Sequence, residues 1–234
     1  MAGRREPSAV RRAVAGTMSF LAGGRLFPGE AAGVGGGDER RHERRDLVVH
    51  AWTSLDGYSC DEGTEMFEVM RDVEDPVGDD LFARRLASAG THIMGRVTYL
   101  EMADFWPKSS DVNAAPMNDI PKVVFSRTLQ TAAWPQTRIA SGDTAQEIAR
   151  LKAEPGGEII AHGGTQFVRS LTRLGLVDRY RFYVLPFAAG EGVPLFTPDA
   201  HPGQLRLEQS TAYPAGILEL VYTPAPSGGP DGTR

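Results

Sequence analysis

The alternation of strand-like and helical segments after Leu47 is the feature that most constrains the fold of this chain. Short apolar runs typical of buried strands stand at 47–53 (LVVHAWT), 91–94 (THIM), 122–126 (KVVFS) and 158–161 (EIIA). Stretches with helical periodicity follow or precede them, near 78–89, 97–104, 144–153 and 165–174. Repeated strand–helix units predict an α/β fold with a mainly parallel central sheet.

The last third of the chain has a different pattern. YRFYVLPF, LRLEQSTAY and GILELVYT are strand-like runs joined without intervening helices. Strands joined in this way usually pair antiparallel. We therefore expect a mixed sheet, mainly parallel, with antiparallel strands at its C-terminal edge.

Composition divides the chain into three parts. Residues 1–46 contain GVGGG and paired arginines without a sustained hydrophobic period, which indicates a flexible basic and glycine-rich leader. Residues 47–223 are expected to form one domain, and the final 11 residues, 224–234 (PAPSGGPDGTR), a disordered tail. A chain of 234 residues is long enough for one generous core.

Charge and cysteine content exclude several classes of protein. The leader has nine arginines and six acids, which leaves 16 basic and 24 acidic residues for the remainder, a balance that argues against a nucleic-acid surface. The single cysteine, Cys60, provides neither a disulfide nor a zinc set. No apolar run reaches the roughly 20 residues that span a bilayer, and no secretory signal core is present. A cytoplasmic protein without metal, membrane or nucleic-acid partners is expected.

Familiar nucleotide and nucleophile motifs are missing. GVGGG follows no predicted strand, and neither a GxxxxGK[ST] loop nor a GxSxG elbow occurs. None of the five histidines has a motif partner, and His162 is interpreted as structural.

Two glycine clusters stand between a predicted strand and a predicted helix. They are Gly95 in IMGRVTY and Gly163 with Gly164 in IIAHGGTQ. Bare N–H groups at a helix N-terminus bind anions, and glycine lets a pyrophosphate approach the backbone. The alternative is that these glycines only form tight turns.

Two further groups are candidate phosphate ligands. Ser126 and Arg127 directly follow the run KVVF, where a hydroxyl and a guanidinium suit a phosphomonoester such as the 2′-phosphate of NADP. Arg96 stands at another strand–helix junction. The alternative for both arginines is a solvated or salt-bridged surface residue.

Four motifs in linear order carry a resemblance. TSLDGY, MGRVTYLEM, VVFSRTL and IIAHGGTQFVRSLTRLGLVDRYRFYVLPFAAGEGVPLF resemble the dihydrofolate reductase superfamily, and more narrowly the C-terminal domain family of the riboflavin-pathway bifunctional deaminase-reductase. The resemblance covers about 47–223. It implies a dihydrofolate-reductase-like three-layer sandwich, NADPH along the C-terminal edge of the sheet, hydride transfer to a small-molecule substrate, and a homodimer.

The resemblance also implies roles for individual residues. The cofactor would be bound by Gly95, Arg96, Val97, Thr98, Ser126, Arg127, Gly163, Gly164, Thr165 and Gln166. The substrate would be bound by Trp52, Leu55, Gly57 and Tyr99. Asp56, in the loop after the first strand, is the candidate catalytic carboxylate, with a turn residue as its alternative.

The chain departs from the family pattern in two respects. It has neither HxE nor PCxxC, so the zinc motif of the deaminase half is absent. The acid that a dihydrofolate reductase carries on its first helix has no clear counterpart, and Glu68 and Asp72 are the candidates. The acidic stretch 61–80, with Pro76 as a helix breaker, is expected to be a substrate loop or lid, or a solvated insertion.

These features predict an NADPH-dependent reductase acting on a pterin-, pyrimidine- or ribosylamino-type heterocycle, like 5-amino-6-(5-phosphoribosylamino)uracil reductase. Two alternatives stay open: a non-catalytic NADPH-binding or regulatory protein, and a scaffold that retains only the fold. The sequence names no proton donor.

Overall fold

The fold is described from a computed structural model in which residues 44–60, 65–73 and 75–225 are placed, apart from the side chains of residues 71 and 72. Most of the expected leader and of the expected tail lies outside these ranges. The elements are β1 (Leu47–Thr53), α2 (Glu65–Asp72), α3 (Pro76–Ala87), β2 (Ala89–Gly95), α4 (Arg96–Phe105), η2 (Trp106–Lys108), α5 (Ala114–Asp119), β3 (Lys122–Phe125), β4 (Thr137–Ala140), α6 (Thr144–Ala153), β5 (Glu158–Ala161), α7 (Thr165–Arg173), β6 (Arg179–Val184), β7 (Leu205–Ala212) and β8 (Leu218–Pro224).

The eight strands of this region form one sheet in the order β4-β3-β2-β5-β1-β6-β8-β7. Each neighbouring pair from β4 to β6 is parallel, and β8 pairs antiparallel with both β6 and β7. The expected mixed sheet with antiparallel strands at its C-terminal edge is confirmed.

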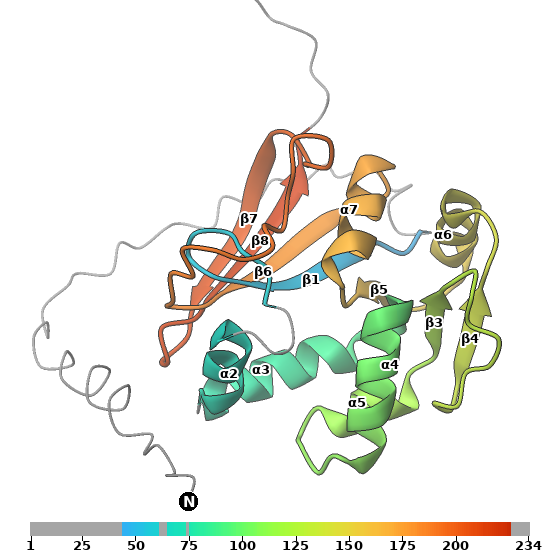
Figure 1. Cartoon of the computed structure of the whole chain (residues 1–234), viewed down its shortest axis with the longest axis horizontal. Helices are drawn as coiled ribbons and strands as arrows, with labels where there is room; N and C mark the ends of the chain where they lie inside the picture. The colour runs from blue at the N-terminus through green and yellow to red at the C-terminus, as the bar shows by residue number, and fades with distance from the viewer. Residues whose placement is uncertain (1–43, 61–64, 74, 226–234) are drawn as a thin grey trace, which may run out of the picture. The chain divides into compact units, whose positions relative to one another are not determined.

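Helices cover both faces of the sheet (Figure 1). On one face, α6 and α7 bury Ile148 and Leu171 against alternate residues of β1, β2 and β5. On the other face, α3, α4 and α5 bury Leu86, Tyr99 and Met117 against Met94 and its neighbours. Three layers result because the inner strands are apolar on both sides.

Three elements were not expected from the sequence. β4 is an edge strand of only four residues, and one of its side chains is buried. Its sequence therefore has little of the apolar pattern that identifies a strand. α5 is six residues long and contains Pro116. α2 falls within the acidic stretch 61–80, where a loop or insertion was expected, and Met66 anchors it in a small core cluster.

No helix runs continuously through Pro76: α2 ends at Asp72, and Pro76 is the first residue of α3. The Asp75 side chain accepts a hydrogen bond from the Gly78 N–H at 2.9 Å and caps this helix. Proline is favourable in the first turn because the N–H that it lacks would have no partner there.

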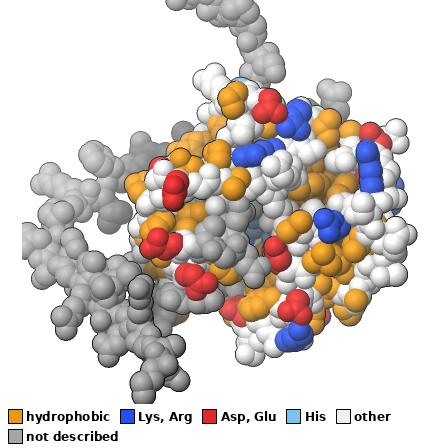
Figure 2. All heavy atoms as spheres, in the orientation of Figure 1, with side chains coloured by type: hydrophobic (Ala, Val, Ile, Leu, Met, Phe, Trp, Pro, Cys, Tyr) orange, Lys and Arg blue, Asp and Glu red, His pale blue; other side chains and the backbone are white. Residues whose placement is uncertain are grey.

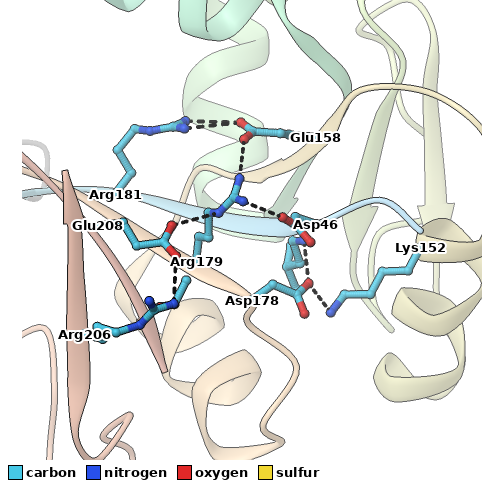
Figure 3. Close-up of polar contacts among 10 residues, drawn as sticks. Asp46, Lys152, Glu158, Asp178, Arg179, Arg181, Arg206 and Glu208 are labelled. Carbon is cyan, nitrogen blue, oxygen red and sulfur yellow. Dashed lines mark hydrogen bonds and ion pairs between the residues drawn. The ribbon is translucent and has the colours of Figure 1, made fainter. Parts of the chain in front are cut away.

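Ion pairs gather at the amino ends of the parallel strands (Figure 3). The Arg179 guanidinium pairs with Asp46 at 3.2 Å, with Glu158 at 3.4 Å and with Glu208 at 3.4 Å. Arg181 also pairs with Glu158. The charged side chains at this amino edge pair with one another. We therefore expect a ligand site at the opposite edge, where the carboxyl ends of the parallel strands lie.

Candidate functional site

The candidate site lies where the chain leaves two neighbouring parallel strands toward opposite faces of the sheet. β2 continues into α4 on one face, and its neighbour β5 continues into α7 on the other. In open α/β sheets such a switch point forms a crevice outside the carboxyl ends of the strands, where ligands bind. The two glycine clusters of the sequence meet here, since the Gly95 N–H donates to the Gly163 carbonyl at 3.4 Å.

Glycine is required at this junction. Gly163 has φ +91°, a left-handed conformation that side-chain-bearing residues rarely adopt, and its peptide bond to Gly164 is cis. A Cβ on Gly164 would lie 3.2 Å from the Thr98 hydroxyl oxygen, and one on Gly95 would lie 3.3 Å from the Cβ of Phe167. A side chain at Gly95 or Gly164 would therefore crowd the helix that starts beside it.

Both helix N-termini lack a side-chain cap. Gly95 and Gly164 are the N-cap residues of α4 and α7, and neither has a side-chain oxygen that could accept from the first-turn N–H groups. Of the expected cofactor ligands, Val97 and Gln166 are exposed on these first turns, whereas Thr98 and Thr165 are buried. Two uncapped N-termini provide N–H donors and positive dipole ends for an anion.

The turn after β3 reaches the same edge, because β3 is parallel to β2 and next to it. The Ser126 hydroxyl accepts from the N–H groups of Thr128 (3.2 Å) and Leu129 (2.9 Å), which shapes the turn and occupies this hydroxyl. Arg127 and Arg96 are exposed, and neither forms an ion pair within the placed ranges. Both guanidiniums are available to a phosphate.

The loop after β1 carries Asp56, whose carboxylate is already bound. Its oxygens accept hydrogen bonds from the N–H groups of Ala189 (3.0 Å) and Gly190 (2.8 Å). Hydrogen bonds from the Ser54 side chain and from these two N–H groups lower the pKa of Asp56 to about 2. This carboxylate is therefore ionised at neutral pH and clamps two loops, which is the geometry of a turn residue more than of a proton donor.

Beside that loop, three aromatic rings form a wall. Trp52 stacks on Tyr183 with centroids 4.7 Å apart, and Phe82 of α3 meets both rings edge-on at 5.6 and 5.2 Å. Trp52 and Phe82 are half-buried. Of the other expected substrate residues, Leu55 is 69% exposed in the loop, and Gly57 turns it with φ +85°.

Tyr99 is not brought to this wall. It is 2% exposed in the core between the sheet and α4, and its hydroxyl accepts a hydrogen bond from the Trp134 N–H at 3.1 Å. Tyr99 and the preceding Thr98 lie on the buried side of α4, so the contacts of Tyr99 are those of a packing residue. Of the two candidate acids on α2, Glu68 is exposed, and the Asp72 side chain lies outside the described residues.

Three histidines that lack a sequence motif converge on the α3 and α4 face. His92 on β2 and His162 after β5 are joined between Nδ1 and Nε2 at 2.8 Å, and the His50 ring on β1 lies 6.0 Å from that of His162. His50 and His92 are buried and His162 is half-buried. In the sequence, the only hint is that each histidine lies in or directly after a strand-like run. The order of β2, β5 and β1 in the sheet, which the sequence does not state, brings the three histidines together.

Burial keeps all three imidazoles neutral. It lowers the pKa of His92 to about 4. Burial also lowers the pKa values of His162 and His50, with the Arg181 charge adding to the effect on His50. Within the face shown in Figure 2, histidine atoms are visible at the bottom of a hollow.

Other concave regions of the described chain are elsewhere. A hollow of about 620 Å³ is lined by α4 and η2, including Leu100, Asp104 and Phe105, and one of about 160 Å³ lies at the amino ends of β2 and β3.

Among the placed residues, no helix is long and apolar enough to cross a membrane. The same residues contain no group of three or more His, Cys, Asp and Glu side chains arranged for a metal ion.

The residues at the switch point have the chemistry of a phosphate-binding site. Uncapped helix N-termini and two arginines, Arg96 and Arg127, that form no ion pair with the described residues supply donors suited to phosphates, and Gly95 and Gly164 leave little room for a side chain beside them. Fold and site together define the class as an α/β domain of the dihydrofolate-reductase-like type. The chain belongs to the RibD C-terminal domain family, which matches residues 45–218.

Relatives and solved structures agree with this placement. The chain is 28% identical over 185 residues to the uncharacterized protein YyaP of Bacillus subtilis (strain 168), covering 77% of this chain and 95% of that protein. A candidate riboflavin biosynthesis protein from Shewanella sp. PV-4 superposes with a TM-score of 0.63 at 22% identity, over 76% of this chain and 98% of that one. Dihydrofolate reductase from Enterococcus faecalis, complexed with NADP(H), does so with a TM-score of 0.53 at 14% identity, over 77% and 98%.

Proposed function

We propose that the protein is an NADPH-dependent reductase that transfers a hydride to a pterin-, pyrimidine- or ribosylamino-type heterocycle. The observation that carries the proposal is the contact between Gly95 and Gly163, which joins two uncapped helix N-termini at the switch point of the sheet. Family membership supports the reductase class.

The proposed site divides into a cofactor part and a substrate part. The first turns of α4 and α7 would hold the pyrophosphate, and Arg127 the 2′-phosphate that distinguishes NADPH from NADH. NADPH supplies the hydride when bound. Trp52 and Phe82, the half-buried rings of the wall, offer flat apolar surface on which a heterocycle can stack, and the buried Tyr183 supports Trp52.

Asp56 acts in this proposal by holding the loop after β1 against residues 189–190. Its carboxylate is ionised and its oxygens accept backbone N–H groups, so it orients Trp52 and Leu55 and does not deliver a proton. We further propose that residues 47–223 form the catalytic domain and that the protein acts in the cytoplasm as a homodimer.

A second candidate is a non-catalytic NADPH-binding protein of the same fold. The observation that favours it is the state of the titratable groups beside the wall: Asp56 is ionised, and His50 and His162 are neutral, so none is a charged proton donor at neutral pH. A reductase would then take its proton from an ordered water or from the substrate.

Fluorescence titration of the purified protein with NADPH, and with NADH as the control, tests the cofactor. The same samples are then followed for NADPH oxidation against pterins, pyrimidines and ribosylaminopyrimidines. NADPH-selective binding with oxidation supports the reductase, and binding without oxidation by any of the panel supports the second candidate. Absence of binding to either nucleotide would refute both.

A further inference from the structure

We infer that His162 and His50 form an acceptor and donor pair that binds the N–H and C=O groups of a lactam edge on the substrate. The inference rests on the proposed function, because it names the part of the heterocycle that the reductase would bind. It follows from which ring nitrogens already have partners.

The first chain of hydrogen bonds starts at a backbone carbonyl. The Pro116 carbonyl oxygen lies 3.2 Å from Nε2 of His92, and a carbonyl only accepts, so Nε2 of His92 carries the proton. Nδ1 of a neutral His92 is then an acceptor, and it lies 2.8 Å from Nε2 of His162. His162 therefore donates from Nε2, and its Nδ1 keeps a lone pair.

A second chain fixes His50 in the opposite sense. Nε2 of His50 faces a guanidinium nitrogen of Arg181, and a guanidinium only donates. Nε2 of His50 is thus the acceptor, and Nδ1 carries the proton. This Nδ1–H is buried and has no hydrogen-bond partner in the described part of the chain.

Arg181 is itself held in place. Its guanidinium pairs with Glu158 at 3.3 Å and with the buried Glu219 at 3.4 Å, so turning away from His50 would break two ion pairs. The protein thereby fixes both tautomers from outside the site. Such supporting contacts orient the groups that meet a ligand.

The two free ring nitrogens belong to the candidate site. His162 directly precedes Gly163 at the end of β5, and no described residue hydrogen-bonds its Nδ1. The His50 ring lies 6.0 Å from that of His162 and contacts Phe82 and Tyr183 of the aromatic wall at 6.1 and 5.8 Å. A heterocycle stacked on the half-buried Phe82 or Trp52 would have this pair at its edge.

The chemistry of the pair selects a ligand class. A lone pair on His162 needs a ligand N–H, and the N–H of His50 needs a ligand oxygen. Adjacent N–H and C=O groups are the edge of a cyclic amide, as in oxidised pyrimidines and pterins. A carboxylate offers only acceptors and would leave His162 unpaired, at a cost typical of an unmade buried hydrogen bond.

The tautomers are measured directly by two-bond ¹H–¹⁵N correlation spectra of histidine-labelled protein at pH 7, with and without NADPH. We expect His162 in the Nε2–H form and His50 in the Nδ1–H form. A charged His162, or His162 in the Nδ1–H form, would overturn the inference. The measurement needs no variant, so it does not depend on whether a substituted protein folds.

Ligand selection is tested in the same samples with 5,6-diaminouracil and its 1,3-dimethyl counterpart, which lacks both ring N–H groups. We expect the parent compound to bind about tenfold or more tightly than the dimethyl compound, with the His162 Nδ1 resonance shifting on binding. Equal affinities would refute the pair as a lactam site.

His92→Phe removes the hydrogen-bonded link between Pro116 and His162, so it should reduce the preference for the parent compound, whereas His201→Gln, at an exposed histidine, should not.

NADPH titration of the same proteins separates the two proposals. If NADPH fails to bind while the tautomers are as assigned, the proposed function fails and the histidine assignment stands. If NADPH binds and His162 is in the other form, only the lactam pair fails.

Discussion

The carboxylate of Asp56 and the backbone N–H of Gly190 form a 2.8 Å hydrogen bond across 134 residues of sequence. A second bond, from the Ala189 N–H, makes this side chain a clamp between the loop after β1 and the chain that follows β6. The position at which sequence reasoning placed a catalytic carboxylate therefore has a structural task.

Asp56→Asn should lower the melting temperature at pH 7, because the neutral amide replaces a charged acceptor and has one acceptor oxygen. The pKa of Asp56 falls from 3.8 to about 2 on folding, so its contribution is fully present above pH 4 and is lost as the pH falls through 2. The gap in melting temperature between wild type and variant should shrink over that window. Asp80→Asn, which changes a surface carboxylate paired with Arg84, is the control. A gap that is constant from pH 7 to 2 would contradict the clamp.

Arg127→Ala should weaken NADPH binding roughly tenfold to a hundredfold, the range for losing hydrogen bonds to a charged group. NADH lacks the 2′-phosphate, so its dissociation constant should change little. Fluorescence titration with both nucleotides measures the two constants. Arg84→Ala removes an exposed arginine from α3 and serves as the matched control. Equal losses for NADPH and NADH would exclude Arg127 as the 2′-phosphate ligand.

Gly163→Ala should destabilise the protein by about 1–2 kcal/mol, because Gly163 has φ +91°. Cofactor affinity should fall with it, since this residue starts the turn into α7. Gly142→Ala is the matched control, because its Cβ would meet no atom within 4 Å and its φ is ordinary. Urea unfolding and NADPH titration of both variants provide the comparison. Similar effects from the two substitutions would argue against a conformational requirement at Gly163.

The buried histidines should make the protein sensitive to mild acid. The pKa of His92 falls from 6.5 to about 4 on folding, so the unfolded chain binds more protons between these values and stability decreases as the pH drops through that window. His92 alone would contribute a loss of roughly 3 kcal/mol by pH 4. Urea unfolding at pH 7 and pH 5 measures the effect, which should be smaller in His92→Gln and unchanged in His201→Gln. An identical slope in His92→Gln would show that His92 is not the titrating group.

Much of the fold follows from local sequence. The runs at Leu47–Thr53, Thr144–Ala153 and Glu158–Ala161 form the expected elements with the expected bounds. Hydrophobic periodicity is a short-range property, and burial on both faces makes the inner strands continuous apolar runs. β4 and α5 were missed because they are only four and six residues long and α5 contains Pro116, and α2 was missed because its acidic surroundings favoured a loop.

By itself, the sequence determined the strand–helix order and the glycines at two strand ends, because both are written in neighbouring residues. Only the tertiary structure decided that Gly95 meets Gly163, that Tyr99 turns into the core, and that Asp56 is held by Gly190. It also brought His50, His92 and His162 together from three separate segments. The physical reason is the strand order: residues far apart in the chain become neighbours only when β1, β5 and β2 lie side by side in the sheet.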